Sequence, residues 1–302
     1  MSHLRVAELF SVEGLVAVIT GGGSGLGRIM ALTLAENGAS KVFIIGRRPE
    51  ALQETAAQSS KPEAIVPIQA DISSKESLQG AYEAIAAQTG HVDLLIANSG
   101  IMGPVNRPPG PKPDGSAPSL SEVRDQLWSA SMEEFSKVFE VNVTGAYFTV
   151  LAFLPLLEAA NQRRPAPQKN KASAPTAQVI ITSSIAGFNR RVPFSVAYNL
   201  SKASTNQLIK ILATTLSSYD IRVNGIAPGL YLSEMSTMNF QDGDKGISDG
   251  SFPRDMIPLT RAGSEQDMAS LILWMAGPSG AYLNGNITIT DGGRVSAVPC
   301  TY

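Results

Sequence analysis

Short apolar runs alternate along this chain with longer segments in which apolar residues recur every three or four positions. The apolar runs, each expected to form a buried strand, are 16–20, 41–45, 64–69, 93–97, 178–182, 222–226 and 286–290. The segments with helical spacing are 28–37, 49–58, 74–89, 131–160, 196–218 and 266–276. Because strands alternate with helices, the pattern predicts a doubly wound α/β fold, with one seven-stranded parallel sheet and helices on both faces.

Two segments interrupt this alternation. Residues 103–119 are rich in proline and glycine, and residues 162–177 mix proline and alanine with lysine and arginine. The alternation resumes after each of them. We therefore expect surface loops inserted into a single domain that spans residues 1–302, rather than linkers between domains.

Composition narrows the function classes. With 43% hydrophobic and 17% charged residues the chain can bury a large core, and its net charge of −2 gives no argument for binding nucleic acid or an anionic membrane. The only histidines are His3 and His91 and the only cysteine is Cys300, so we expect no metal site and no intrachain disulfide. No apolar run reaches the ~18 residues that span a bilayer, and the start of the chain lacks the apolar core of a signal peptide. We expect a soluble, cytoplasmic protein.

A glycine-rich turn lies between the first predicted strand and the first predicted helix, where residues 20–27 have the sequence TGGGSGLG. Glycines at such a turn let the backbone approach a pyrophosphate, which rests on the positive N-terminus of the helix. A glycine-rich string can also be no more than a flexible loop, but the strand–turn–helix context favours a dinucleotide site.

The glycine spacing Thr-Gly-x-x-x-Gly-x-Gly resembles the cofactor turn of short-chain dehydrogenases/reductases. Further segments typical of that family follow in its order, so that the resemblance runs from about residue 15 to residue 293: VNVTG (141–145), SSIAG (183–187), YNLSK (198–202), NGIAPG (224–229), PLTRAG (258–263) and DGG (291–293). The segment NSG (98–100) departs from the family's usual Asn-Asn-Ala-Gly. The resemblance implies cofactor contacts at Gly21, Ser24, Gly25, Leu26, Gly27, Asp71, Ile72, Asn98, Gly100, Tyr198, Lys202, Pro228, Gly229, Tyr231 and Ser233.

Two arginines end the second predicted strand and indicate which cofactor is used. An acidic residue at this place would bond the adenosine ribose of NAD, whereas arginine accommodates a 2′-phosphate. Here Arg47 and Arg48 follow the strand, and no carboxylate occurs before Glu50. The pair could merely solvate a loop, but its position predicts NADP(H) rather than NAD(H).

Tyr198 and Lys202 stand four residues apart on a predicted helix, and therefore on one face. A phenol with a pKa near ~10 is a poor acid or base at neutral pH, and a neighbouring ammonium favours its phenolate. Taken alone, a tyrosine and a lysine at this spacing more often share a helix face without any catalytic role. The family resemblance implies that Tyr198 is the acid/base, that Lys202 stabilises its tyrosinate, and that Ser184 hydrogen-bonds the substrate carbonyl, with Ser183 as the alternative.

Asn142 lies inside an otherwise apolar predicted helix. Asparagine is unfavourable there unless its amide has a partner, so a kink or a buried polar contact would account for it. The resemblance implies a catalytic role instead, in which Asn142 holds a water that links Lys202 to solvent.

The resemblance implies hydride transfer between NADPH and the carbonyl of a ketone, and a hydrophobic polyketide-type or acyl ketone from secondary metabolism is one candidate substrate. The alternatives are an alcohol dehydrogenase working oxidatively, a non-redox dehydratase or cyclase that uses bound cofactor, and a cofactor-sensing protein. A variable substrate lid is expected at residues 230–258. Its apolar members could contact the substrate or simply pack on the core: Tyr231, Met235, Met238, Phe240 and Phe252. Relatives pair as dimers or tetramers through the helices equivalent to 132–157 and to the Tyr198 helix.

Overall fold

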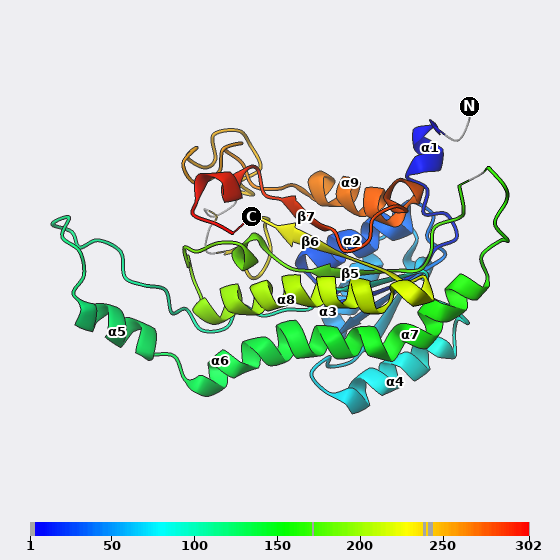
Figure 1. Cartoon of the computed structure of the whole chain (residues 1–302), viewed down its shortest axis with the longest axis horizontal. Helices are drawn as coiled ribbons and strands as arrows, with labels where there is room; N and C mark the ends of the chain where they lie inside the picture. Colours follow the sequence, from blue (N-terminus) through cyan, green and yellow to red (C-terminus); the bar gives the residue numbers. More distant parts are fainter. Residues whose placement is uncertain (1–3, 171, 238–239, 241–243, 302) are drawn as a thin grey trace.

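The fold is one seven-stranded parallel sheet with helices on both faces (Figure 1). The computed structural model describes residues 4–170, 172–237, 240 and 244–301. The strands are β1 (Val16–Thr20), β2 (Lys41–Gly46), β3 (Ile65–Gln69), β4 (Leu94–Ala97), β5 (Gln178–Thr182), β6 (Arg222–Pro228) and β7 (Ile287–Thr290). Their order in the sheet is β3-β2-β1-β4-β5-β6-β7, and every neighbouring pair is parallel. The predicted doubly wound α/β fold is confirmed.

The central strands are apolar on both faces because both faces are covered. All five residues of β1 are buried, and so are all four of β4. Alternate β1 residues enter different clusters: Val18 packs on one face of the sheet and Ile19 on the other. A parallel sheet buried on both sides takes such continuous apolar runs, which is why the sequence shows runs rather than alternation in its strands.

Helices cover the two faces in separate sets. The helices are α1 (Val6–Leu9), α2 (Gly25–Glu36), α3 (Pro49–Ala57), α4 (Lys75–Ala86), α5 (Leu120–Trp128), α6 (Met132–Phe139), α7 (Ala146–Gln162), α8 (Val196–Thr215) and α9 (Glu265–Ala276). Core residues of α2, α3 and α9 share one cluster with the sheet, and those of α4, α7 and α8 share the other. The short helices α1 and α5 were not expected from the sequence.

The predicted helix 131–160 is present, with one local change of geometry. Between α6 and α7 the backbone takes a π-helical form over Glu140–Gly145, the segment that contains Asn142. By length and composition the whole stretch Met132–Gln162 could cross a membrane, contrary to our expectation, but 44% of its most apolar window is buried in the fold. Phe153 and Leu157 pack in the core against the sheet, as residues of a core helix in a soluble protein do.

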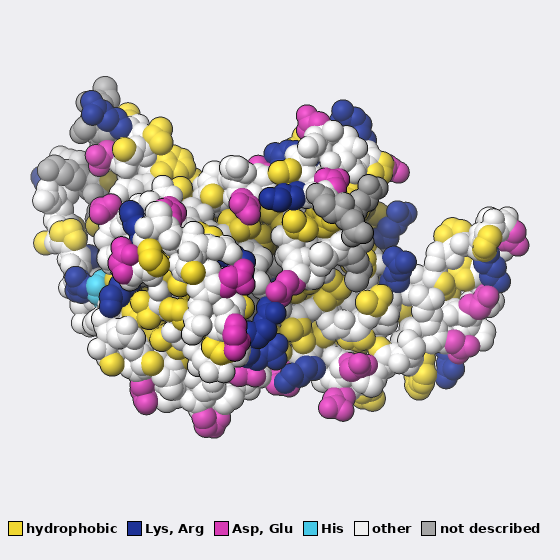
Figure 2. All heavy atoms as spheres, turned by 180° about the vertical axis from the view of Figure 1, so that it is seen from behind, with side chains coloured by type: hydrophobic (Ala, Val, Ile, Leu, Met, Phe, Trp, Pro, Cys, Tyr) yellow, Lys and Arg dark blue, Asp and Glu magenta, His cyan; other side chains and the backbone are white. Residues whose placement is uncertain are grey.

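The first inserted segment forms an arm rather than a simple loop. Residues 103–119 lead into α5, whose N-terminus is fixed by a capping box between Ser119 and Glu122. The arm projects from the body of the molecule in both Figure 1 and Figure 2, and its apolar side chains include Leu120 (84% exposed) and Trp128 (73% exposed). The capping box could have indicated this helix from the sequence. However, none of the residues of α5 is buried, so the helix has no apolar face that a sequence pattern would reveal.

Candidate active site

One cavity of about 1030 Å³ lies along the carboxyl ends of the strands. Its walls come from the loops after β1, β2, β3, β4, β5 and β6, together with α8 and the segment 230–236. The sheet order reverses between β1 and β4, and in open α/β sheets ligands bind at this switch point. The cavity therefore lies where the fold places a ligand.

The glycine-rich turn is shaped for a dinucleotide. Gly21 and Gly25 have positive φ angles of 69° and 51°, and a Cβ at Gly27 would overlap the carbonyl oxygen of Gly21. Helix α2 begins after Ser24 without a side-chain cap, and Ser24, Gly25 and Leu26 line the cavity. The backbone N–H groups at this helix start suit the pyrophosphate of a nicotinamide dinucleotide, so the residues present fit that cofactor.

Asn98 braces the glycine turn instead of serving only as a cavity wall. Its Nδ2 donates to the carbonyl oxygens of Thr20 (3.2 Å) and Gly21 (3.4 Å), and its Oδ1 accepts a hydrogen bond from Thr182 Oγ1 (3.1 Å). Thr20 Oγ1 accepts the backbone N–H groups of Asn98 and Ser99. This network joins the ends of β1, β4 and β5. Thr20 begins the recognised Thr-Gly-x-x-x-Gly-x-Gly spacing but was given no role of its own, and Thr182 was missed because it belongs to no motif.

Arg47 and Arg48 both line the cavity at the end of β2. Arg48 is 61% exposed and forms an ion pair of 2.7 Å with Glu234, a residue of the segment expected to be a lid. That pair raises the pKa of Arg48 and lowers the pKa of Glu234. Glu234 also accepts a hydrogen bond from Ser24 Oγ (3.3 Å), so one carboxylate reaches both the glycine turn and the predicted 2′-phosphate site. No motif in the sequence pointed to Glu234.

The remaining predicted cofactor residues also border the cavity. Asp71 accepts hydrogen bonds from the backbone N–H and the hydroxyl of Ser73, and these bonds lower its pKa. The other lining residues of this group are Ile72, Gly100, Pro228 and Gly229. Gly229 lies so close to Asp291 that a Cβ would collide with it, which fixes the turn after β6 against the turn after β7.

Tyr198, Lys202 and Ser184 come together on one wall of this cavity. The Lys202 ammonium donates to the carbonyl oxygen of Thr182 (2.7 Å) and lies 5.7 Å from the centre of the Tyr198 ring. Burial raises the pKa of Tyr198, while its hydrogen bond with Ser184 acts in the opposite direction. Burial is the larger of these two effects, so the pKa of Tyr198 is raised on balance rather than lowered as the Tyr198–Lys202 pairing suggested.

The structure separates the two serines. Ser183 is 1% exposed and its hydroxyl donates to the Lys202 carbonyl oxygen (3.2 Å) and to Asn206 Oδ1, so it anchors β5 to α8. The hydroxyl of Ser184 accepts the backbone N–H of Ala186 (3.1 Å), and Ser184 lies near enough to Tyr198 to lower the pKa of that phenol. The role of Ser184 at the substrate carbonyl stays a prediction.

Asn142 is a clamp in this structure. Its Oδ1 accepts the backbone N–H of Ile101 (2.8 Å), and its Nδ2 donates to the Ile101 carbonyl oxygen (2.9 Å) and to Ser201 Oγ (3.0 Å). The buried amide is thus bonded on both sides, and the π-helical segment carries it between the loop after β4 and α8. The buried polar contact weighed from the sequence is present, and the role in holding a water stays a prediction.

The segment expected to be a substrate lid divides into two parts. Ser233 packs over Gly25, and Met235 lines the cavity. Tyr231 also lines the cavity, but its hydroxyl is hydrogen-bonded to Thr290 (2.6 Å). This bond disfavours a contact between the Tyr231 hydroxyl and a cofactor. Phe240 and Phe252 pack edge to face with ring centres 6.0 Å apart in a small separate core. For these two residues, packing rather than substrate contact is therefore what the structure shows. Met238 lies outside the described residues.

This arrangement can perform proton transfer beside a bound dinucleotide. A phenol whose pKa is raised keeps its proton at neutral pH and can donate it to an oxygen held by Ser184. Burial lowers the pKa of Lys202 to about 8, so its ammonium is present at neutral pH next to that phenol.

Comparison with known proteins agrees with the fold and the motifs. The family model described as short chain dehydrogenase matches residues 15–244. The short-chain dehydrogenase/reductase PhomF of Diaporthe leptostromiformis is 44% identical over 99% of this chain and 97% of its own length. The structure titled Pseudomonas aeruginosa RhlG/NADP active-site complex superposes with a TM-score of 0.76 at 31% identity, covering 95% of this chain and 99% of RhlG. The 3-ketoacyl-(acyl-carrier-protein) reductase of Brucella melitensis, complexed with NADH, gives 0.73 at 27% identity over 94% of this chain and all of its own.

The family model matches most of the chain, PhomF is well above 30% identical over nearly the whole of both proteins, and the seven-stranded parallel sheet is the one expected from the sequence. The chain belongs to the short-chain dehydrogenase/reductase family, a family of oxidoreductases whose fold binds a nicotinamide cofactor.

Proposed function

We propose that this protein reduces a ketone to an alcohol with NADPH. The observation that carries the proposal is the meeting of Ser184, Tyr198 and Lys202 on the wall of a cavity whose other end is the glycine turn. The proposed direction is reduction because burial raises the pKa of Tyr198, which suits a proton donor better than a proton acceptor.

In this mechanism a bound NADPH supplies the hydride and the chain supplies the rest. Ser184 and Tyr198 hold the substrate oxygen by hydrogen bonds. Tyr198 transfers its phenolic proton to that oxygen as negative charge develops on it. Lys202 then stabilises the tyrosinate electrostatically and would bind the nicotinamide ribose. Asn142 maintains the water path that returns the proton to Tyr198.

The preference for NADP(H) rests on the basic end of the cavity. Arg47 and Arg48 line it, and guanidinium groups bind a phosphate through paired, charge-assisted hydrogen bonds. The RhlG structure is titled as an NADP complex and the Brucella structure as an NADH complex, so relatives of both kinds exist. We expect Arg47→Ala and Arg48→Ala to lower kcat/KM with NADPH while leaving kcat/KM with NADH nearly unchanged. Equal efficiency of the unaltered protein with both cofactors would contradict the preference.

Two other activities remain as alternatives on the same site. An alcohol dehydrogenase working oxidatively needs Tyr198 as the tyrosinate, a form that the raised pKa makes scarce at neutral pH. A non-redox dehydratase or cyclase would form product without consuming NADPH. Measuring product and cofactor together separates the three reactions.

The test is a panel of hydrophobic ketones, including polyketide-type and acyl ketones, with NADPH consumption as the readout. Tyr198→Phe removes the donated proton and is expected to lower kcat by about 100-fold or more, while NADPH binding measured by fluorescence is retained. Tyr219→Phe is the matched control, since Tyr219 is 62% exposed beyond the end of α8. Normal turnover in Tyr198→Phe would overturn the proposed mechanism.

We further propose that the protein works in the cytoplasm as a homodimer or homotetramer. Helices α6–α7 and α8 lie side by side on one face (Figure 1), and Tyr147, Leu200 and Ile211 expose apolar surface there. Light scattering of the purified protein tests the assembly, and a monodisperse monomer at micromolar concentration would contradict it.

A further inference from the structure

The charged side chains that line the cavity are unevenly distributed. Its two acids, Asp71 and Glu234, both belong to the end that holds Arg47 and Arg48. At the opposite end, among the residues that the structure describes, the lining contains the cation Arg294 and no carboxylate. The cofactor contacts proposed above do not use this arginine.

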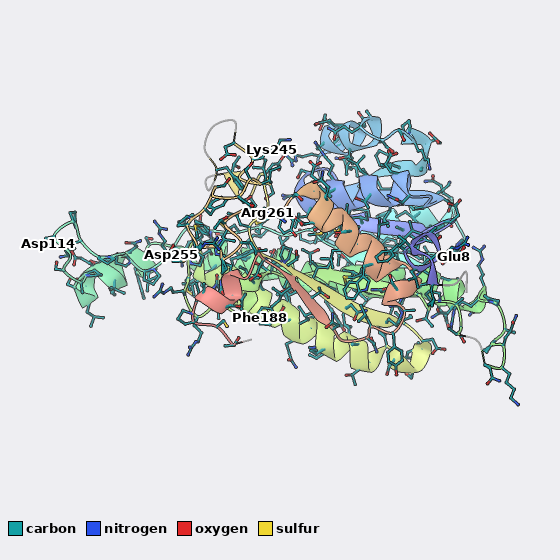
Figure 3. The ribbon with its side chains drawn as sticks, turned by 90° about the horizontal axis from the view of Figure 1, so that it is seen from above. Glu8, Asp114, Phe188, Lys245, Asp255 and Arg261 are labelled. Atoms are coloured by element: carbon teal, nitrogen blue, oxygen red, sulfur yellow. The ribbon has the colours of Figure 1, made fainter. Side chains whose placement is uncertain are left out.

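Arg294 begins a short 3-10 helix (Arg294–Ala297) directly after the turn that follows β7. On one side this C-terminal segment is bonded to the residue that follows the proposed lid (230–258), because the Leu259 N–H donates to the Gly292 carbonyl oxygen (3.0 Å). On the other side it is tied to the segment that follows Ser184, through the Thr301 N–H and the carbonyl oxygen of Phe188 (2.8 Å). Figure 3 shows Phe188 beside this part of the ribbon. Arg294 is therefore held at the substrate end of the cavity, between the proposed lid and the segment that carries Ser184.

The guanidinium of Arg294 is partly buried and, among the residues that the structure describes, its side chain makes no hydrogen bond and no ion pair below 4.0 Å. The nearby carboxylate of Asp291 is directed to the backbone instead, since it accepts the N–H groups of Gly293 (2.8 Å) and Val295 (2.7 Å). Burial lowers the pKa of Arg294, with Asp291 acting in the opposite direction. A guanidinium that is partly removed from water and has no acceptor within the described residues gains hydrogen bonds when an anion binds beside it.

We propose that Arg294 binds a carboxylate carried by the substrate, so that the preferred substrate is an oxo acid rather than a neutral ketone. This rests on the proposed reductase function and names its substrate class. Arginine is suited to this task because its planar fork forms two parallel hydrogen bonds with a carboxylate. The lining of the same cavity also includes the apolar side chains of Val105, Pro193 and Phe194, which suits a substrate with a hydrocarbon body between the reacting carbonyl and the carboxylate.

The experiment compares oxo acids with their methyl esters, in a series that varies the number of carbons between the ketone and the carboxylate. We expect the unaltered protein to prefer at least one acid over its ester. Arg294→Met should lower kcat/KM for that acid by about 10- to 100-fold, mainly through KM, and leave the ester unchanged, as expected for loss of hydrogen bonds to a charged group. Arg294→Lys should restore part of the loss. Arg191→Met, at an exposed arginine outside the cavity lining, is the matched control.

A second measurement does not require turnover. Calorimetry should detect the hydroxy acid product binding to the protein loaded with NADP⁺, and this binding should weaken in Arg294→Met. Equal preference for acid and ester throughout the series would overturn the inference while leaving the reductase function intact. An equal loss with both, or a raised KM for NADPH, would overturn it too, because Arg294 would then serve the fold or the cofactor. Failure to reduce any ketone would refute the reductase function, and the calorimetric result would still decide whether Arg294 binds a carboxylate.

Discussion

At the scale of single residues, the chemistry depends on how burial tunes two groups on α8. Tyr198 and Lys202 are neighbours on one helix face, where Lys202 is buried and Tyr198 is partly buried, and removal from water disfavours the charged form of each. The pKa of the phenol is raised and that of the amine is lowered to about 8. The pair is therefore a neutral acid beside a cation near neutral pH, which is the state that ketone reduction needs.

This tuning predicts the pH dependence of the reductase. Lys202 loses its positive charge as the pH rises through about 8, whereas Tyr198 keeps its proton to a higher pH. We therefore expect kcat/KM for reduction to be level below about pH 7 and to fall as the pH rises through about 8. The profile is measured with saturating NADPH and a neutral ketone.

Arginine keeps its charge throughout this range, so the residual activity of Lys202→Arg should lack the alkaline decline. Lys210→Arg, at an exposed position of the same helix, should keep the decline unchanged. A level profile across the alkaline range in the unaltered protein would show that the charge of Lys202 is not needed.

At the scale of elements, the segment after β6 is linked to the opposite side of the cavity. Ser233 packs over Gly25 and Glu234 reaches Arg48 and Ser24, so the segment crosses the mouth above the glycine turn. In the proposed complex with NADPH, the 2′-phosphate and the carboxylate of Glu234 would therefore compete for Arg48. The pair is more than half exposed, so the competition is weak.

Glu234→Gln removes the competing charge and keeps the shape of the side chain. We expect it to tighten NADPH binding by about two- to five-fold, as for loss of an exposed ion pair, and to leave NADH binding unchanged. Arg48→Ala should act in the opposite direction on NADPH alone. Fluorescence titration with both cofactors checks this, and an equal effect of Glu234→Gln on NADPH and NADH would show that the acid acts on the turn rather than on Arg48.

At the scale of the whole molecule, the site depends on a core that holds the strand ends in register. Phe153 of α7 is fully buried and contacts Tyr82 of α4 edge to face, with ring centres 6.1 Å apart. It belongs to the cluster that joins α4, α7 and α8 to the sheet. A cavity at this point would loosen the helix that carries Tyr198 as well as the helix that carries Phe153.

Phe153→Ala is expected to lower the free energy of unfolding by about 3–5 kcal/mol, because it removes apolar contacts and leaves a void. Glu158→Ala, at an exposed position of the same helix, should change it by less than about 0.5 kcal/mol. Urea unfolding followed by circular dichroism measures both. A similarly small change in the two variants would mean that the core repacks around position 153.

The sequence by itself determined the order of strands and helices, the glycine turn and the spacing of Tyr198 and Lys202. These features are local, since apolar periodicity and positions four residues apart on a helix do not depend on distant parts of the chain. The projecting α5 helix was missed although its capping residues were readable, because α5 has no buried face to give it an apolar pattern.

Tertiary structure alone decided which side chains meet. It made Asn98 a brace of the glycine turn, brought Glu234 to Arg48 across 186 residues, and placed Arg294 in the cavity lining with no ion pair to any described residue. It also decided the direction of the Tyr198 pKa, because burial depends on everything packed around the ring. No local pattern could supply these facts, since hydrogen bonding and desolvation depend on distances between segments that only the folded chain brings together.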